Sequence, residues 1–571
     1  MLLAASVGVI VIGLVVVLST RPGAPSCGKY ALTQGASTVL DGGVSVSPSG
    51  DAADLRFDSA ALAEAAVADA ANAQVLAAVH AMPPGLRTVG AVITFERCGE
   101  SATPVLLSVP APDPKLDAYA WDGDHWAWLG GSTDRVVAAL PDLPQIVAWV
   151  ESLPTAPIIG TEPDPATGGL APEYAGVITE LYAPGLTVVA NGTLSGQAPA
   201  APAPGAPYVV YPVIGNLADG QVDTAVLQAM LGSEPARKAH ADTLVKLAMG
   251  TNFAGVAIDY RGLAAQWRDP YAALIEELAE ALHASGRQLV VVVPEPLAAG
   301  VTSYDTQGYD WARIGRAADA VQVEMPIDVA AYHAGGQAVA FLKWAGTQVN
   351  RGQIQPILSA ASLEQAAPYR AISFADAVRG LAPSGVTATI STTAGTPLLF
   401  SLNPSGTLTY DASTGAYNYP FATSAGVVRR SVHTAATLSA KLSALAGLRL
   451  RGAMVRSVQG KQAAPGLAGP IKAYRQQAVS SGSGDLSVDW SVQAADGSRA
   501  AGESRALSQS NWTWTPNREG IFNVSAAVAS VKLDIARVTV GKGGTPADVA
   551  GGTIVTGTAD GDCPNAAYVA D

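Results

Sequence analysis

The sequence predicts a multidomain protein built around an α/β TIM barrel, with β-rich regions on both sides of it. The chain has 571 residues, and a prior of roughly 150 residues per domain suggests three or four domains. Hydrophobic residues make up 49% of the chain and charged residues 14%, which is typical of a packed globular protein. Between residues 157 and 474, apolar strands alternate with helical stretches, the pattern of βα units and a parallel sheet.

Residues 1–20 form the first segment and are apolar from Met1 to Leu18. About 20 such residues are needed to cross a bilayer. The basic start and the small-residue cleavage site of a secretory signal are missing. We therefore expect a transmembrane anchor, with a signal segment as the alternative, and place the rest of the chain outside the cytoplasm at the cell surface.

Residues 27–153 are expected to form a β-rich domain, because short alternating runs are bounded there by Gly, Pro or Asp. The run "AWDGDHWAW" at 120–128 is typical of a hairpin with an Asp-Gly turn. Of three cysteines, Cys27 and Cys98 are the candidates for a disulfide in an exported protein. The alternative is that all three are inert buried thiols.

The barrel is assigned to residues 157–474. Eight strand candidates fit a TIM barrel. They are residues 156–160, 177–185, 207–215, 255–261, 288–296, 320–328, 352–360 and 451–458. Residues 386–421 interrupt the alternation of strands and helices, and we expect them to form an antiparallel insertion between the seventh and eighth βα units.

Residues 484–541 alternate strictly between apolar and polar positions, which favours an immunoglobulin-like β-sandwich. Residues 542–571 are rich in Gly and Thr and are expected to be a flexible tail that leads into the start of a further domain.

The composition argues against several classes of function. A net charge of −13 and the absence of any Lys/Arg run disfavour nucleic-acid binding. Six scattered histidines, and cysteines without ligand spacing, predict no metal site. No phosphate-binding loop or dinucleotide fingerprint stands out, so no cofactor is expected.

The stretch "FAGVAIDYRGL", residues 253–263, carries an acid and a base two residues apart at the end of the fourth barrel strand. Alternation along a strand places Ala257, Asp259 and Arg261 on the same inward face. A carboxylate and a guanidinium therefore reach one point.

Residues 157–458 resemble glycoside hydrolase family 18, chiefly its branch of spore-cortex peptidoglycan N-acetylglucosaminidases. The family's fourth-strand motif D-G-x-D-x-D-x-E corresponds here to Ala254–Arg261. The resemblance extends to "YPVIGN", which ends at Asn216, to residues 308–328 and to residues 429–458.

The resemblance implies a substrate-assisted mechanism, in which a Glu protonates the leaving oxygen and an Asp orients the substrate's acetamide. Asp259 matches the orienting Asp, but Arg261 stands at the acid's position. The family's strand-six Tyr is replaced in Met325-Pro326-Ile327-Asp328, and its floor Trp falls on Arg456. Arginine stays protonated and cannot deliver a proton. We therefore expect a catalytically silent barrel.

These observations predict a surface-anchored, non-catalytic protein of a bacterial cell envelope that binds a cell-wall or extracellular glycan, or acts as a scaffold for envelope proteins. A buried Arg261 needs partners, and Asp259 and Glu324 are the candidates. The candidate ligand-binding residues are Asp259, Arg261, Glu295, Glu324, Met325, Asp328, Arg456, Asn216 and Tyr304.

Two alternatives stay open. The ion pair around Arg261 could merely fill an abandoned pocket. The chain could also be an active glycosidase that hydrolyses β-linked N-acetylglucosamine polymers, such as peptidoglycan or chitin, with a displaced acid at Glu295 or Glu324.

Overall fold

A computed structural model of the chain describes residues 28–542 and the short strands 553–554 and 569–570. Its internal gaps are residues 50–54, 68–71, 100–102, 114, 132–133, 154, 219, 252, 301–302, 367, 383–387, 403–407 and 479–485. The expected anchor at residues 1–20 lies outside the described residues. Among the helices that are described, none is long and apolar enough to span a bilayer.

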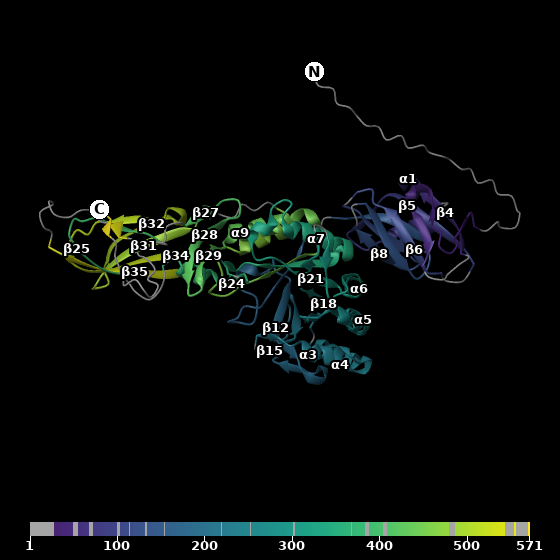
Figure 1. Ribbon diagram of the computed structural model, residues 1–571, viewed down its shortest axis with the longest axis horizontal. Helices are drawn as coiled ribbons and strands as arrows, with labels where there is room; N and C mark the ends of the chain where they lie inside the picture. The colour runs from purple at the N-terminus through teal and green to yellow at the C-terminus, as the bar shows by residue number, and fades with distance from the viewer. Residues whose placement is uncertain are drawn as a thin grey trace, which may run out of the picture. The chain divides into compact units, whose positions relative to one another are not determined.

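The chain divides into two compact units, of which the first covers most of the residues up to 151. This unit contains two antiparallel sheets (Figure 1). The first sheet has the order β1 (Tyr30–Ala31), β4 (Arg56–Leu62), β5 (Leu86–Cys98), β10 (Ile146–Ser152), β7 (Asp117–Trp121) and β8 (Trp126–Gly131). The second has the order β2 (Thr38–Val39), β3 (Ser45–Pro48), β6 (Val105–Pro110) and β9 (Arg135–Leu140). Two short helices, α1 (Glu64–Val67) and α2 (Ala73–His80), complete it.

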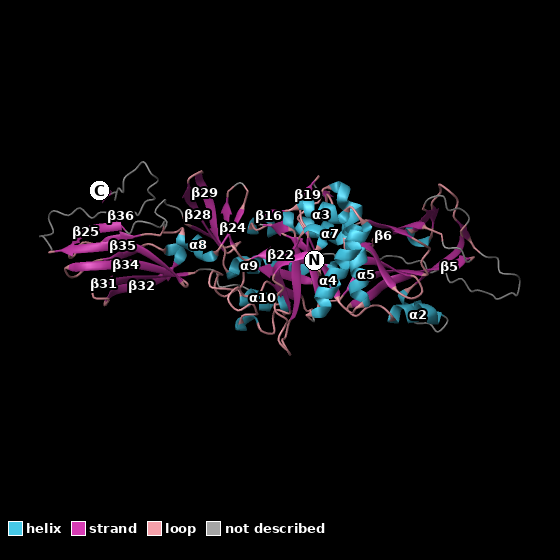
Figure 2. Cartoon of the chain, turned by 90° about the horizontal axis from the view of Figure 1, so that it is seen from below, coloured by secondary structure: helices cyan, strands magenta, loops and turns pink. Residues whose placement is uncertain are grey.

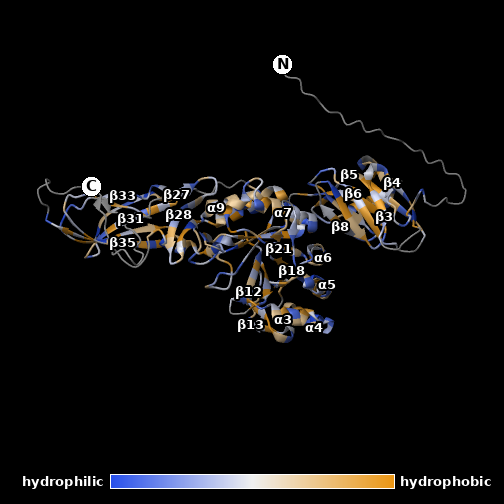
Figure 3. Cartoon of the chain, viewed as in Figure 1, coloured by the Kyte–Doolittle hydropathy of each residue, from blue (hydrophilic) through white to orange (hydrophobic). Residues whose placement is uncertain are grey.

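The two sheets of this unit share a core that includes Phe57, Leu107 and Trp149. Figure 3 shows the hydrophobic residues gathered along its strands. Cys98, at the end of β5, is disulfide-bonded. Cys27 lies outside the described residues, so the pairing of these two cysteines stays a prediction.

The second unit contains a closed barrel of eight parallel strands, which confirms the predicted TIM barrel. The strands are β11 (Ile158–Thr161), β12 (Glu180–Val188), β14 (Val209–Gly215), β17 (Gly255–Asp259), β18 (Gln288–Val293), β21 (Ala320–Glu324), β22 (Ile354–Ser359) and β30 (Gly452–Arg456). The barrel closes because β11 pairs with both β12 and β30. Each of the eight predicted strand segments overlaps one of these strands, and six of the segments contain the whole strand.

Helices follow most of the strands, and Figure 2 shows them around the barrel. They are α3 (Thr224–Leu231), α4 (Glu234–Gly250), α5 (Arg268–Ala284), α6 (Trp311–Ala317), α7 (Gln337–Gln348), α9 (Ala435–Leu445) and α10 (Ala468–Arg475). Short strands β13 (Leu194–Gly196), β15 (Leu217–Ala218), β16 (Gln221–Val222), β19 (Leu297–Ala298) and β20 (Tyr304–Asp305) extend the loops. Strand β18 is a run of apolar residues because a parallel strand is covered on both faces.

Side chains fill the interior of the barrel. Tyr182 and Tyr211 stack with their ring centroids 5.3 Å apart and contact Ala257 and Met454 in one buried cluster. The bidentate pair of Glu180 and Arg451, with bonds of 2.8 and 2.9 Å, lies where β12 begins and β30 is about to begin. An ion pair therefore closes the barrel at the amino ends of its strands. The candidate site residues lie at the opposite end, where the strands have their carboxyl ends.

An insertion follows β22 and forms a sheet of its own. The strand order is β24 (Arg370–Ile372), β23 (Ser362–Gln365), β29 (Gly426–Val432), β28 (Ala416–Thr423) and β27 (Thr409–Asp411), with helix α8 (Phe374–Arg379) beside it. The strands of residues 409–432 pair antiparallel.

The first strands of the 386–421 segment pair instead with strands near the C-terminus. β25 (Ala388–Thr393) lies parallel to β35 (Val531–Gly541), in a sheet continued by β34 (Gly520–Val528), β31 (Ser487–Ala494) and β32 (Arg499–Ala506). β26 (Leu398–Phe400) pairs with β33 (Trp512–Trp514) in a second sheet with β36 (Thr553–Ile554) and β37 (Val569–Ala570). Trp490 of the first sheet stacks on Trp512 of the second, with ring centroids 5.6 Å apart. The C-terminal β-rich region is thus built from two separate parts of the chain.

Candidate functional site

The candidate site lies at the mouth formed by the carboxyl ends of the barrel strands. Asp259, Glu324 and Arg456 are the last residues of β17, β21 and β30. Arg261 follows β17 by two residues, and Glu162 directly follows β11. Because the strands are parallel, their carboxyl ends meet at one end of the barrel, where TIM-barrel enzymes carry their active sites.

Arg261 is held between two carboxylates. Its Nε and Nη2 atoms donate to the two oxygens of Asp259 over 2.7 and 2.8 Å. The same Nη2 donates to Glu324 Oε1 over 2.7 Å. A fork of this kind is the strongest geometry for a guanidinium and a carboxylate. The partners expected from the sequence are therefore both in contact with Arg261.

The backbone of Arg261 is fixed by Asn216, which is fully buried. The Arg261 N–H donates to Asn216 Oδ1 over 2.8 Å, and Asn216 Nδ2 donates to the Arg261 carbonyl over 3.0 Å. Asn216 Nδ2 also reaches the carbonyl of Asp223. The side chain of Asn216 is thus used in positioning the loop that carries Arg261.

Arg456 continues the chain of charges. Its Nη1 donates to Glu324 Oε1 over 2.7 Å, and its Nε lies 3.3 Å from Glu162 Oε1. The five groups alternate in the order Asp259, Arg261, Glu324, Arg456 and Glu162. We call these five residues the mouth ladder. It contains three carboxylates and two guanidinium groups.

Three members of the ladder, Glu324, Arg261 and Glu162, have shifted pKa values. Burial works to raise the pKa of Glu324, but the charges and hydrogen bonds of Arg456 and Arg261 outweigh it and lower that pKa. Desolvation works against the protonated form of Arg261, yet its bonds to Asp259 and Glu324 raise its pKa further above the usual range. The pKa of Glu162 is raised, chiefly by burial, with Arg456 opposing. Glu324 therefore stays ionised and Arg261 stays protonated.

Glu295 follows β18 by two residues and is exposed. Its Oε1 accepts a bond of 3.3 Å from Gln337 Nε2. Partial desolvation, and then the charge of Glu324, raise the pKa of Glu295. At the mouth, the pKa values of Glu295 and Glu162 both move towards those of a general acid.

The remaining candidates have structural contacts. Tyr304 packs 4.7 Å from the ring of Trp344 and 5.5 Å from that of Phe341, measured between centroids. Met325 is buried. The side chain of Asp328 accepts from the Ala330 N–H over 2.9 Å and from Gln365 Nε2 over 3.3 Å. Among the described residues, no hydrogen bond or ion pair links the side chain of Tyr304 or Asp328 to the mouth ladder.

Two charged groups near the mouth were not among the candidates. Glu162 could have been recognised, because it directly follows the first strand just as Asp259 ends the fourth. Lys441 is fully buried in α9 and donates to the carbonyls of Ile327 and Ser359 over 2.6 and 2.8 Å. Helical periodicity gives no reason to expect a lysine at such a position. Among the described residues, no group of His, Cys, Asp and Glu is arranged to hold a metal ion.

Comparisons with known proteins gave matches only among solved structures. No family model matches the chain, and no curated protein does. A chitinase from Chromobacterium violaceum ATCC 12472 is 19% identical and covers 56% of this chain and 98% of its own, with a TM-score of 0.43. The spore cortex-lytic enzyme SleL of Bacillus megaterium QM B1551 is 15% identical, with coverages of 60% and 79% and a TM-score of 0.41.

A putative sporulation-specific glycosylase, ydhD of Bacillus subtilis, is 17% identical and covers 48% of this chain and 90% of its own, with a TM-score of 0.37. The assignment of the barrel itself rests on the pairing of its own eight strands.

Proposed function

We propose that this protein is a non-catalytic glycan-binding protein of the cell envelope, with a barrel of the glycoside hydrolase family 18 type. The observation that carries the proposal is the position of Arg261, whose guanidinium is bound by both oxygens of Asp259 and by Glu324 at the barrel mouth.

The contacts of the mouth ladder oppose the family's reaction. A general acid must release its proton near the working pH, and Arg261 has its pKa raised instead. Both oxygens of Asp259 accept from Arg261, so the fork turns this carboxylate towards Arg261 and competes with an acetamide for it. Glu324 is kept ionised by two arginines and cannot supply a proton.

The charge of the mouth favours a neutral glycan over an acidic one. The ladder has one more carboxylate than guanidinium groups, and Glu295 adds a further acid nearby. An anionic sugar would meet net repulsion there, whereas the hydroxyl and amide groups of a neutral N-acetylhexosamine can bond to both kinds of side chain.

The location is part of the proposal. The bonded state of Cys98 supports an oxidising compartment outside the cytoplasm, where disulfides persist. We propose that residues 1–20 anchor the chain, and that the N-terminal unit and an immunoglobulin-like C-terminal region serve as contact modules for envelope proteins.

One observation favours a second function, an active glycosidase with a displaced acid. The pKa of Glu295 is raised, as a general acid requires, and Glu295 lies after a barrel strand at the same end as the mouth. A test must therefore follow turnover and binding together.

The experiment compares the natural protein with Arg261→Met, Glu295→Gln and the control Arg505→Met. Arg505 also pairs with a carboxylate, Glu503 at 2.9 Å, but in β32 of the C-terminal region. With a chromogenic N-acetylglucosaminide and with peptidoglycan we expect no turnover. In calorimetry with an N-acetylglucosamine oligomer we expect binding that weakens about tenfold in Arg261→Met, as for a lost hydrogen bond to a charged group, and is unchanged in Arg505→Met.

Turnover by the natural protein that disappears in Glu295→Gln would establish the second function and reject the first. If the protein showed neither turnover nor glycan binding, both functions would be rejected. The mouth ladder would then only fill the mouth of the barrel.

A further inference from the structure

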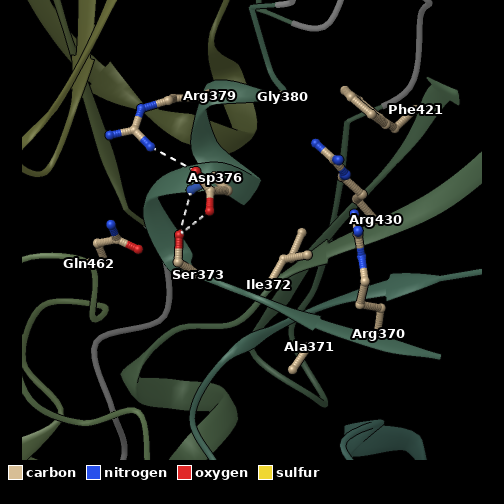
Figure 4. A pocket seen from close by; sticks show the side chains of 10 residues that line it. All are labelled: Arg370, Ala371, Ile372, Ser373, Asp376, Arg379, Gly380, Phe421, Arg430 and Gln462. Carbon is tan, nitrogen blue, oxygen red and sulfur yellow. Dashed lines mark hydrogen bonds and ion pairs between the residues drawn. The ribbon is translucent and has the colours of Figure 1, made fainter. Parts of the chain in front are cut away.

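A second candidate site lies in the insertion, formed by residues outside the mouth ladder. It is a pocket of about 710 Å³ between β24, α8, β28, β29 and the loop after β30 (Figure 4). Its lining consists of Arg370, Ala371, Ile372, Ser373, Asp376, Arg379, Gly380, Phe421, Arg430 and Gln462. We call it the insertion pocket. Its volume is in the range of pockets that hold small molecules.

Three arginines line this pocket. Figure 4 shows Arg370 and Arg430 on one side and Arg379 on the other, with Asp376 between them. The carboxylates that pair with them are Glu364, shared by Arg370 and Arg430, and Asp376, bound to Arg379. Three guanidinium groups therefore face two carboxylates, in a chain whose overall charge is −13.

Arg430 is the fixed part of the arrangement. Its Nε and Nη2 bind Glu364 Oε2 over 2.7 and 2.6 Å, and its guanidinium lies 3.2 Å from the centroid of the Phe421 ring. The side chains of Arg430 and Glu364 are 11% and 5% exposed. Gly380 is needed here, because a Cβ at that position would lie 2.6 Å from Arg430 Nη1. This packing gives the pocket a rigid, positively charged wall.

Arg370 and Arg379 are the parts that can bind a ligand. Their side chains are 64% and 56% exposed, and each is paired with one carboxylate oxygen at 2.7 Å. A guanidinium carries five N–H donors in a planar fork, so one such bond leaves donors for an oxyanion. Gln462 and Ser373 add neutral polar groups to the same lining, and Ile372 and Phe421 add apolar surface.

We propose that the insertion pocket binds an anionic saccharide unit through Arg370 and Arg379, which lie on opposite sides of the pocket. The charge of the pocket selects an oxyanion, and its volume and mixed lining suit a sugar ring attached to it. The oxyanion can be a carboxylate, as in a uronic acid, or a phosphate ester. The site goes beyond the proposed function, because its lining includes no residue of the mouth ladder and its ligand has the opposite charge preference to the mouth.

The test uses the full-length protein and calorimetry with four probes: a glucuronate-containing disaccharide, glucose 6-phosphate, the neutral disaccharide cellobiose and inorganic phosphate. We expect at least one of the two acidic sugars to bind, about tenfold or more tightly than cellobiose or inorganic phosphate. The acidic sugar that binds more tightly shows whether the pocket prefers a carboxylate or a phosphate ester. Raising the salt concentration should weaken the binding.

Variants connect the binding to the pocket. Arg370→Ala and Arg379→Ala should each weaken the acidic sugar about tenfold, and the double variant further. Both side chains are more than half exposed, so the fold should survive, which a thermal melt checks. The control is Arg429→Ala. Arg429 is an exposed arginine directly before Arg430 in the sequence, but it does not line the pocket, so this substitution should leave the affinity for the acidic sugar unchanged.

Equal binding of cellobiose and the acidic sugars, equal binding of inorganic phosphate, or an unchanged affinity in the double variant would each overturn the proposal. Arg261→Met separates this result from the proposed function, because a change at the barrel mouth should leave binding in the insertion pocket unaffected.

Discussion

Arg261 and Lys441 are two cations near the carboxyl ends of the barrel strands, and their surroundings shift their pKa values in opposite directions. Arg261 has two carboxylates in direct contact, so its pKa rises despite burial. Lys441 donates to two carbonyl oxygens, and burial lowers its pKa to about 7, with Asp328 opposing at longer range. A full opposite charge within bonding distance is the difference between them.

The environment of Lys441 makes folding stability depend on pH. The unfolded lysine, with a pKa near 10.5, keeps its proton above pH 7, where the folded one loses it. The unfolded state then binds more protons, so the free energy of unfolding rises with pH between about 7 and 10.5, by up to about 1.4 kcal/mol per pH unit. The contribution is unfavourable below pH 7 and is relieved as pH rises.

Lys441→Met should remove this pH dependence. The measurement is the free energy of unfolding at pH 7, 8 and 9 for the natural protein and the variant, with Lys343→Met, an exposed position in α7, as the control. Met also leaves the carbonyls of Ile327 and Ser359 without their donor, which lowers stability at every pH. The readout is therefore the slope of the free energy of unfolding against pH, and not its absolute value. Equal slopes in all three proteins would contradict the assignment.

At the scale of the element, the barrel strands were predictable because each is buried on both faces. A strand such as β18, with the sequence QLVVVV, gives a continuous apolar run that local sequence reveals. The alternation of the fourth strand likewise placed Asp259 and Arg261 on one face. Glu324 was expected on the sixth strand as a partner of Arg261, and Arg456 was found through the resemblance to glycoside hydrolase family 18.

Other features depend on which strands pair, and local sequence does not contain that information. β25 has the pattern of a strand, but nothing in residues 388–393 shows that its partner is β35, nearly 150 residues later. The insertion pocket has the same origin, because its arginines come from β24, α8 and β29 and form no motif. Pairings of high sequence separation are set by the whole fold.

The pairing of β25 gives a prediction for Ile390, which is 5% exposed in the middle of that strand. Ile390→Asp would bury an unpaired charge and remove apolar contacts, and should lower the free energy of unfolding by about 3 kcal/mol. Thr389→Asp is the matched control, because that neighbouring side chain is exposed and faces the other way.

The measurement is denaturant unfolding followed by tryptophan fluorescence, to which Trp490 and Trp512 in the core of the C-terminal region contribute. If Ile390→Asp and Thr389→Asp had the same small effect, β25 would not be a structural part of these sheets.

At the scale of the whole molecule, the chain enters the C-terminal sheets twice, once from the barrel insertion and once after α10. Phe400 in β26 packs against both Trp490 and Trp512, and α8 of the insertion contacts β35. The apolar core of the barrel continues into this region as one cluster, whereas the N-terminal unit has a separate core. An element shared between two regions couples their unfolding, because neither keeps its core without it.

We therefore expect two thermal transitions in calorimetry, one for the N-terminal unit and one for the barrel together with the C-terminal sheets. Ile390→Asp should lower the second transition as a whole and leave the first unchanged, although the substitution lies in only one of the sheets. A third transition, with the C-terminal sheets melting at a temperature of their own in the variant while the barrel's transition stays in place, would show that the strands from the insertion do not couple the two regions.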